Sequence, residues 1–280
     1  MQASEIIVNP DNSIYHLKLK NGEVPQKIIT VGDPDRVEAV AQHLDQVFWR
    51  KQNREFHIVS GRIGQEDLLI ISTGIGTDNI DIVLNELQLA YAWDLSSRTP
   101  FAEERPPLQI IRLGTSGALR PEIELDSILI SKAALGFDGL MYFYENTFDF
   151  PDLGLKDFPR PYLAEADAGL LKRFSGIADN VGTTVTANGF YGPQGRSVIS
   201  PTKNKTFLND LASMQIKTGR ITNLEMETAG IYALGSLLNM QCISLSAILA
   251  NRLLGTFSAK PEQSTQALIK AALEVLSAPH

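Results

Sequence analysis

Short apolar runs that end in glycine-containing turns and lead into helical segments recur along the chain, and this alternation constrains the fold more than any other feature. Strands are expected at residues 27–31, 56–62, 68–73, 109–113, 126–134, 182–187 and 241–249. A strand buried on both faces reads as a continuous apolar run, and helices between such strands make them parallel. The pattern predicts an α/β fold, a three-layer sandwich around a mixed, largely parallel central sheet.

The helices expected between these strands differ in the strength of their pattern. Residues 77–93 form the strongest amphipathic segment, with Ile80, Leu84 and Leu87 on one face. Weaker helical patterns cover residues 37–43, 165–179, 203–215 and 260–277. Residues 96–107 are typical of a loop, because they are rich in serine, charged residues and proline.

One long segment fits neither pattern. Residues 137–162 are rich in aromatic residues and proline and have no clear period, which is typical of an ordered insertion, a lid or a subunit contact. No linker is long enough to divide the chain. We therefore expect one domain over residues 1–280, with an insertion at 137–162.

Charge and composition exclude several classes of function. A net charge of −7 argues against general nucleic-acid binding, which requires a basic face. Cys242 is the only cysteine and the histidines have no ligand spacing, so no metal site is expected. No apolar stretch is long enough to span a bilayer, and the N-terminal residues lack the blocks of a signal peptide. We expect a cytoplasmic protein that contacts neither membranes nor nucleic acid.

Residues 221–233 pass from an extended segment into an apolar helix and carry two carboxylates at the junction. Glu225 and Glu227 flank Met226, and on a strand end they share one face because side chains alternate. A carboxylate on so apolar an element is costly unless hydrogen bonds are donated to it. Two interpretations are open: an acid at a helix start that the helix dipole favours, or an acceptor for sugar hydroxyls.

Three segments are candidates for binding an anion. They contain Gly32 and Arg36, Arg112 and Thr115, and Arg54. Glycine lets backbone N–H groups approach an anion, and the planar guanidinium group matches phosphate. Each segment taken alone also fits an ordinary turn or a solvated surface charge.

Residues 190–196 place an aromatic ring, a side-chain amide and a guanidinium group close together, in Phe190, Gln194 and Arg196. Such a set can stack on a flat ring and read its edge. A pyrimidine dione presents alternating acceptors and a donor, which the glutamine amide and the arginine can both bind. The alternative is a turn whose glutamine and arginine face water.

The order of these motifs resembles the nucleoside phosphorylase-I superfamily, from about residue 16 to residue 252. The matching segments are residues 32–36, 72–76, 112–117 and 224–229. Within that superfamily, residues 190–196 resemble the uracil-reading loop of the uridine phosphorylases. The resemblance implies a pentosyltransferase that reversibly cleaves uridine to uracil and ribose 1-phosphate, with orthophosphate as co-substrate and no cofactor.

The resemblance also implies a role for individual residues. The phosphate-binding positions are Gly32, Arg36, Arg54, Arg112 and Thr115. The ribose-binding positions are His16, Thr115, Glu225, Met226 and Glu227. The base-binding positions are Gly117, Phe190, Gln194, Arg196 and Arg252. The residues expected to act in catalysis are Gln194, Arg196 and Glu227.

Two of these residues, His16 and Arg54, match residues that relatives lend to the site of a neighbouring subunit. The resemblance therefore implies at least a homodimer, and a homohexamer built as a trimer of dimers. Some relatives bind a monovalent cation between subunits through a glutamate, an isoleucine backbone and a serine. Glu55 and Ile75 match, but Asn79 stands where the serine would be, so this cation site is incomplete in the sequence.

Three other functions remain open at this point. A phosphorylase of relaxed specificity would take thymidine, deoxyuridine or purine nucleosides. A hydrolase of the same fold would use water instead of phosphate, although Arg36, Arg54 and Arg112 favour phosphate. A non-catalytic nucleoside sensor would keep the pocket and carry out no reaction.

Overall fold

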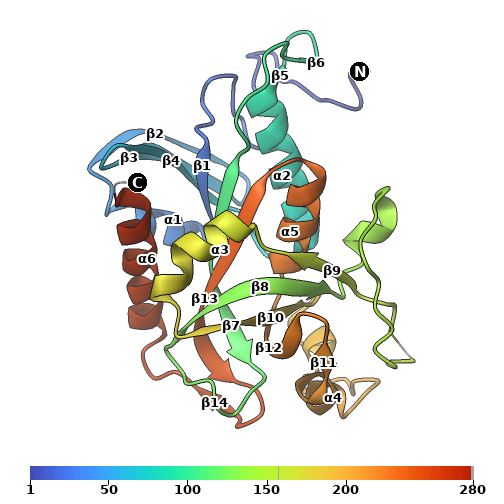
Figure 1. The fold of residues 1–280 in the computed structure, drawn as a ribbon. Helices are drawn as coiled ribbons and strands as arrows, with labels where there is room; N and C mark the ends of the chain where they lie inside the picture. Colours follow the sequence, from blue (N-terminus) through green and yellow to red (C-terminus); the bar gives the residue numbers. More distant parts are fainter. Residues whose placement is uncertain (157, 279–280) are drawn as a thin grey trace.

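The computed structural model describes residues 1–156 and 158–278 and confirms the predicted mixed α/β class (Figure 1). Residue 157, in the predicted insertion, lies outside the described residues. The α-helices are α1 (Pro34–Ala41), α2 (Thr77–Ala92), α3 (Ala168–Phe174), α4 (Phe207–Ser213), α5 (Thr228–Leu237) and α6 (Pro261–Ser277). Within the described ranges, no helix has both the length and the apolar character needed to cross a membrane.

Twelve strands form one sheet in the order β11-β12-β10-β8-β13-β7-β1-β4-β3-β2, with β9 beside β8 and β14 beside β13. They are β1 (Lys27–Val31), β2 (Gln46–Asn53), β3 (Phe56–Ile63), β4 (Glu66–Ser72), β7 (Gln109–Ala118), β8 (Ile128–Gly136), β9 (Tyr162–Glu165), β10 (Asn180–Thr186), β11 (Gln215–Ile216), β12 (Gly219–Glu225), β13 (Gln241–Asn251) and β14 (Thr256–Phe257). The smaller elements are β5 (Trp93–Asp94), β6 (Thr99–Pro100) and the 3₁₀ turns η1 (Leu140–Phe143), η2 (Ser175–Ile177) and η3 (Gly192–Gln194).

The sheet is mixed because two parallel groups of strands meet in opposite directions. Strands β4, β1, β7 and β13 are parallel to one another, and so are β8, β10 and β12. The groups join through the antiparallel pair β13–β8, and β2, β3 and β4 form antiparallel hairpins at one end.

Helices cover both faces of the sheet, which gives three layers. Alternate residues of β1 point to opposite faces: Ile28 packs in the core under α2 and α5, and Ile29 in the core under α1, α3 and α6. Figure 1 shows α6, α1 and α3 on one side of the strands and α2 and α5 on the other, with the segment between β8 and β9 extending outward at the right. Both cores consist mainly of buried aliphatic side chains, with some aromatic ones, and their removal from water is the main stabilising term.

Five strands close on themselves around a polar interior. Strand β12 also pairs with β7, through Asn223 with Ala118 and Leu224 with Gly117, so β7, β13, β8, β10 and β12 form a ring. Inside it the Asn223 amide donates to Ser116 (2.9 Å) and accepts from Thr184 (2.8 Å). These side chains are buried and hydrogen-bonded to one another, as buried polar groups must be.

The turn expected after the strand at 109–113 is not a turn. Residues 114–117 continue β7, which runs from Gln109 to Ala118. A Cβ on Gly114 would lie 2.0 Å from Nη1 of Arg112, and one on Gly117 would lie 2.9 Å from Cγ of Arg252. The glycines therefore mark a close approach of arginine side chains to a strand.

Two other expectations need correction. Strand β2 was not expected from the sequence, because its residues alternate between exposed and half-buried positions without a continuous apolar run. The helix expected at 165–179 is confined to α3, because Glu165 ends β9 and the Asp167 side chain caps the helix by accepting from the Leu170 N–H (2.8 Å).

Candidate active site

A cleft of about 800 Å³ opens at the ends of β1, β4, β7, β10, β12 and β13. This is where ligands bind in open α/β sheets. Its lining contains most of the residues that the sequence singled out: Gly32, Arg36, Arg112, Thr115, Gly117, Phe190, Gln194, Arg196, Glu225, Met226 and Glu227.

Arg112 is the centre of the cleft floor. One of its nitrogens donates to Glu227 (2.6 Å) and lies 2.9 Å from a carboxylate oxygen of Glu225. The other lies 3.4 Å from the hydroxyl of Ser244 and 3.5 Å from that of Ser246 on β13. A guanidinium group held by two carboxylates and two hydroxyls has one fixed orientation.

Arg36 lies near Arg112 but is not neutralised in the same way. In the described part of the chain, its side chain makes no hydrogen bond or ion pair. Burial, and then the charge of Arg112, lower the pKa of Arg36 below its ordinary value. Two cationic groups that disfavour each other in a cleft are suited to bind an anion between them.

Glu225 is fully engaged by the protein. It is 4% exposed and accepts from the Thr186 hydroxyl (2.6 Å) and the backbone N–H groups of Glu227 (2.9 Å) and Thr228 (3.0 Å), besides Arg112. The interpretation as an acid at a helix start is thus confirmed for Glu225, at the beginning of α5. A carboxylate in this place interacts favourably with the helix dipole.

Glu227 has more capacity left for a ligand. One oxygen accepts from the backbone N–H of Gly76 (2.9 Å) and the other from Arg112, and each oxygen keeps a lone pair. Burial raises the pKa of Glu227, although the charge of Arg112 opposes the shift. A buried carboxylate that lines a cleft and retains free acceptor sites is suited to bind hydroxyl groups.

The loop after β10 forms a wall of the cleft through Phe190, Gln194 and Arg196. The Arg196 guanidinium donates to the side-chain oxygen of Gln194 (2.8 Å) and lies 3.7 Å from the centre of the Phe190 ring. Burial, and then the charge of Arg252, lower the pKa of Arg196 to about 10. Gln194 is buried and lines the cleft, and no described residue bonds to its amide nitrogen, so that donor is available to a ligand.

Arg252 lies behind this wall and does not line the cleft. One of its nitrogens donates to the backbone oxygen of Gln194 (3.2 Å), and its stem packs against Gly117. Its other terminal nitrogen is buried and has no partner among the described residues. The structure therefore places Arg252 next to the loop, where it supports Gln194.

His16 and Arg54 lie outside the cleft of their own chain. Nδ1 of His16 lies 2.6 Å from Glu86 on α2, and the guanidinium of Arg54 lies 5.8 Å from the ring of Tyr15. Arg54 is exposed and adopts a φ of 55°. The two predicted ligand residues thus lie near each other and outside the cleft lining, although Glu55, the residue after Arg54, does line the cleft.

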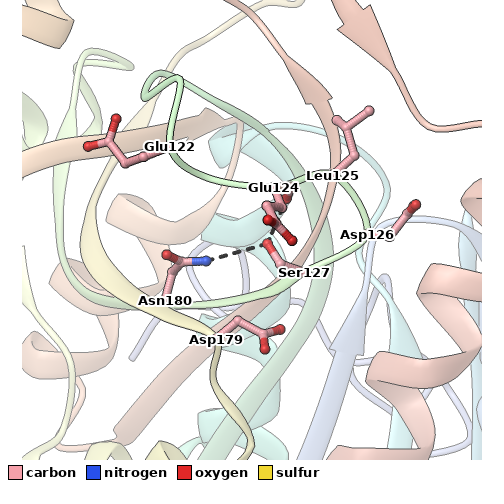
Figure 2. A pocket seen from close by; sticks show the side chains of 7 residues that line it. All are labelled: Glu122, Glu124, Leu125, Asp126, Ser127, Asp179 and Asn180. Atoms are coloured by element: carbon pink, nitrogen blue, oxygen red, sulfur yellow. Dashed lines mark hydrogen bonds between the residues drawn. The ribbon is translucent and has the colours of Figure 1, made fainter.

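A second hollow, lined mainly by acidic residues, does not fit the same chemistry. Figure 2 shows that Asn180 donates to Ser127 (3.4 Å) there and that the carboxylates of Glu122 and Asp126 lie on opposite sides of the group. Asp126 already accepts from Ser258, and Asp179 accepts from the backbone N–H of Ile128. Its negative charge would repel an anion.

Glu55, Ile75 and Asn79, the residues of the incomplete cation motif, all line the main cleft. The Asn79 amide lies close to Gly74, where a Cβ would be 2.4 Å from it. The described residues contain no group of three or more His, Cys, Asp or Glu side chains placed to hold a metal ion.

The sequence reading missed the residues that orient the floor: Ser244, Ser246, Thr186 and the N–H of Gly76. Ser244 and Ser246 lie in a strand that the sequence predicts to be apolar, although they alternate with Ile243, Leu245 and Ala247. That period of two was a usable sign of one polar face. Gly76 contributes only its backbone, which carries no side-chain signal.

Comparison with known proteins places this geometry in context. Residues 26–278 match the family described as the phosphorylase superfamily. A uridine phosphorylase from Thermococcus kodakarensis is 25% identical over 94% of this chain and 86% of its own length. One from Haemophilus influenzae is 26% identical over 95% of this chain and 100% of its own length.

Solved structures agree with the fold. A Trypanosoma brucei nucleoside phosphorylase, described as showing uridine phosphorylase activity, superposes with a TM-score of 0.86 at 26% identity and covers 98% of this chain and 100% of its own. A Toxoplasma gondii purine nucleoside phosphorylase superposes with a TM-score of 0.71 at 21% identity, covering 94% of each chain. The second likeness concerns the fold alone.

Proposed function

Because the chain belongs to the phosphorylase superfamily, we propose that its cleft catalyses the reversible, phosphate-dependent cleavage of uridine to uracil and ribose 1-phosphate. The observation that carries this proposal is that three kinds of group line one cleft. Arg36 and Arg112 provide cations, Glu227 beside Arg112 provides a hydroxyl acceptor, and the Gln194–Arg196 loop provides an amide and a guanidinium group. An oxyanion, a sugar and a flat base require these three kinds of group.

Orthophosphate would bind at the floor, between the guanidinium groups of Arg36 and Arg112. The Gly32 backbone and the Thr115 hydroxyl line the same part of the cleft and complete the set of donors. Holding phosphate against C1′ of ribose makes the reaction effectively unimolecular, which removes much of the entropic barrier.

The ribose would lie on Met226 and Glu227, with Thr115 at its edge. The bond from C1′ to N1 of uracil weakens before the bond from C1′ to phosphate is complete, so positive charge builds on the sugar. Hydroxyl hydrogen bonds to ionised Glu227 strengthen as that charge grows. The protein itself forms no covalent bond to the sugar.

The electron pair of the breaking bond moves to N1 and spreads onto the carbonyl oxygens of the uracil. Arg196 and the free amide of Gln194 are placed to stabilise this negative charge, with Phe190 and Gly117 beside the ring. Preorganised donors of this kind typically lower a barrier by about 2.7–4 kcal/mol each. Arg252 would support the loop from behind.

We further propose that the functional unit is an oligomer of at least two chains, a homohexamer of three dimers by resemblance, in the cytoplasm. The support is the position of His16 and Arg54, which lie outside their own cleft although the resemblance implies that they contact ribose and phosphate. Arg54 is exposed and free to reach a neighbouring chain. No cofactor takes part in the proposed reaction.

The direct test incubates the purified protein with uridine, with and without orthophosphate, and identifies the products. We expect uracil and ribose 1-phosphate, formed only when phosphate is present. Free ribose formed without phosphate would identify a hydrolase. No cleavage, but measurable uridine binding, would identify a sensor. Thymidine, deoxyuridine and inosine tested in parallel measure specificity, because purine nucleoside phosphorylases from Lactococcus lactis also match this chain.

A further inference from the structure

The start of α5 is held by side chains from two neighbouring strands. Glu225 accepts from the backbone N–H groups of Glu227 (2.9 Å) and Thr228 (3.0 Å). The Thr186 hydroxyl donates to Glu225 (2.6 Å) and accepts from the Ala229 N–H (2.8 Å). The residue at the helix cap, Glu227, makes no capping bond with its own side chain. The N–H groups of Glu227, Thr228 and Ala229 are therefore satisfied by side chains from outside the helix.

The Thr186 hydroxyl lies in a fully buried position, where water cannot replace its partners. Thr186 ends β10, where it pairs with Glu225 of β12, and its exposed fraction is zero. If the hydroxyl were removed, the Ala229 N–H and one oxygen of Glu225 would each lose a buried partner. A buried polar group without a partner costs more than the hydrogen bond was worth, so the helix start would shift.

We propose that Thr186 is a positioning residue for the nucleoside. Its hydroxyl orients Glu225 and the first turn of α5, and so holds Met226 and Glu227 where the ribose binds. Thr186 itself is not among the residues that line the cleft, so it acts only through these neighbours. The inference rests on the proposed function for the identity of the ligand.

The test compares three single variants. Thr186→Val keeps the shape and removes the hydroxyl, and Thr186→Ser keeps the hydroxyl. Thr183→Val is the matched control, because Thr183 is a buried threonine of the same strand whose hydroxyl bonds to Thr218. We expect Thr186→Val to raise the KM for uridine by about three- to tenfold, as loss of a positioning hydrogen bond does.

The other measurements separate positioning from general damage. The KM for phosphate should rise less than the KM for uridine, because Arg36 and the contacts of Arg112 with Ser244 and Ser246 do not depend on Thr186. Thr186→Ser should restore the uridine KM, and Thr183→Val should leave it unchanged. Equal loss in Thr186→Val and Thr186→Ser, or a parallel rise in both KM values, would overturn the proposal. If Thr186→Val fails to fold, Thr186→Ala takes its place.

Hydrogen exchange gives a measure that does not depend on the substrate. The Ala229 N–H should exchange faster in Thr186→Val, while Thr186→Ser and Thr183→Val keep the protection of the wild type. Unchanged exchange in Thr186→Val would refute the inference even in an active enzyme. If the wild type does not cleave uridine but the exchange pattern holds, the proposed function fails and the role of Thr186 at the helix stands.

Discussion

The two arginines of the cleft floor differ in how much freedom each has. Arg112 is held by Glu225, Glu227 and two serine hydroxyls, whereas Arg36 has no partner within the described chain. Arg112 is therefore preorganised, and Arg36 is the cation left to be neutralised by an incoming anion. Because the floor is proposed to bind phosphate and the Gln194–Arg196 wall to bind the base, substitutions in the two places should change different kinetic constants.

Arg36→Ala should mainly change the KM for phosphate, and Arg196→Ala should mainly change turnover. Arg36→Ala removes an unpaired cation, so the KM for phosphate should rise while uridine binding is retained. Arg196→Ala removes the group that stabilises the departing uracil, so turnover should fall about 10²- to 10³-fold while phosphate affinity survives. Steady-state kinetics with each substrate varied in turn measure both. Equal loss of phosphate affinity in the two variants would contradict the assignment.

Glu227 makes uridine binding depend on pH. Ionised Glu227 accepts sugar hydroxyls, and burial raises its pKa above the ordinary value of about 4.3. Protonation as the pH falls removes the acceptor, so binding should weaken at a higher pH than for an exposed glutamate. Calorimetric titration of uridine without phosphate, from about pH 7 to pH 5, measures this loss. Glu227→Gln should bind weakly and show no such dependence over that range.

For individual residues, the sequence indicated which ones to consider for the site, but not which contacts each of them would make. The alternation that puts Glu225 and Glu227 on one face was readable from residue spacing. The sequence did not show which carboxylate has its acceptor sites occupied by the protein. The side-chain donors to Glu225, Thr186 and Arg112, lie on other strands. Contacts between distant segments leave no local pattern.

Among the elements, β7 contains a glycine, Gly114, that leaves room for the side chain of Arg112. Gly114→Ala would place a Cβ 2.0 Å from Nη1 of Arg112. The side chain of Arg112 would yield before the strand does, so we expect a folded protein that has lost most of its turnover. Gly176→Ala is the control, because nothing lies within 4 Å of the added Cβ there. Thermal unfolding and uridine cleavage, measured on both variants, separate stability from activity.

The same strand explains why its length could not be predicted. Glycine and serine at 114–117 have the composition of a turn, but pairing with β13 along the segment, and with β12 at Gly117, keeps them extended. Strand β2 was not predicted for a different reason. It lies at the end of the sheet and has no buried face, so its sequence has no apolar pattern. Strong helices such as α2 were predictable because a single long face is apolar.

In the whole molecule, the decisive question is whether one chain completes the site of another. Arg54→Ala and Arg36→Ala protomers should each be weakly active alone. In a mixed dimer, the Arg54→Ala chain keeps its own Arg36 and receives Arg54 from its partner, so one site is intact. Mixed assemblies, prepared by co-expression with two tags, should regain about half the wild-type rate per dimer. If Arg54 acted within its own cleft, mixing would restore nothing.

The closed ring of strands lay beyond the reach of the sequence. Its strands follow the order β7, β13, β8, β10 and β12, which does not follow the chain, and its closure depends on the β12–β7 pair alone. Alternating helices and strands predicted the layers correctly, because each layer is set by local patterns. Which strands become neighbours is decided by packing over the whole chain.

The charges around Arg112 have a consequence for how the protein behaves on dilution. Arg36 and Arg112 carry as much formal charge as Glu225 and Glu227, so these four groups together are close to neutral although Arg36 has no direct partner among the described residues. A phosphate dianion that enters the cleft brings negative charge that a single chain does not offset. If Arg54 of another chain supplies the additional positive charge, the rate of catalysis would be proportional to the fraction of chains that are assembled into oligomers. Specific activity would then decline at low enzyme concentration, and assembly itself would serve as the switch.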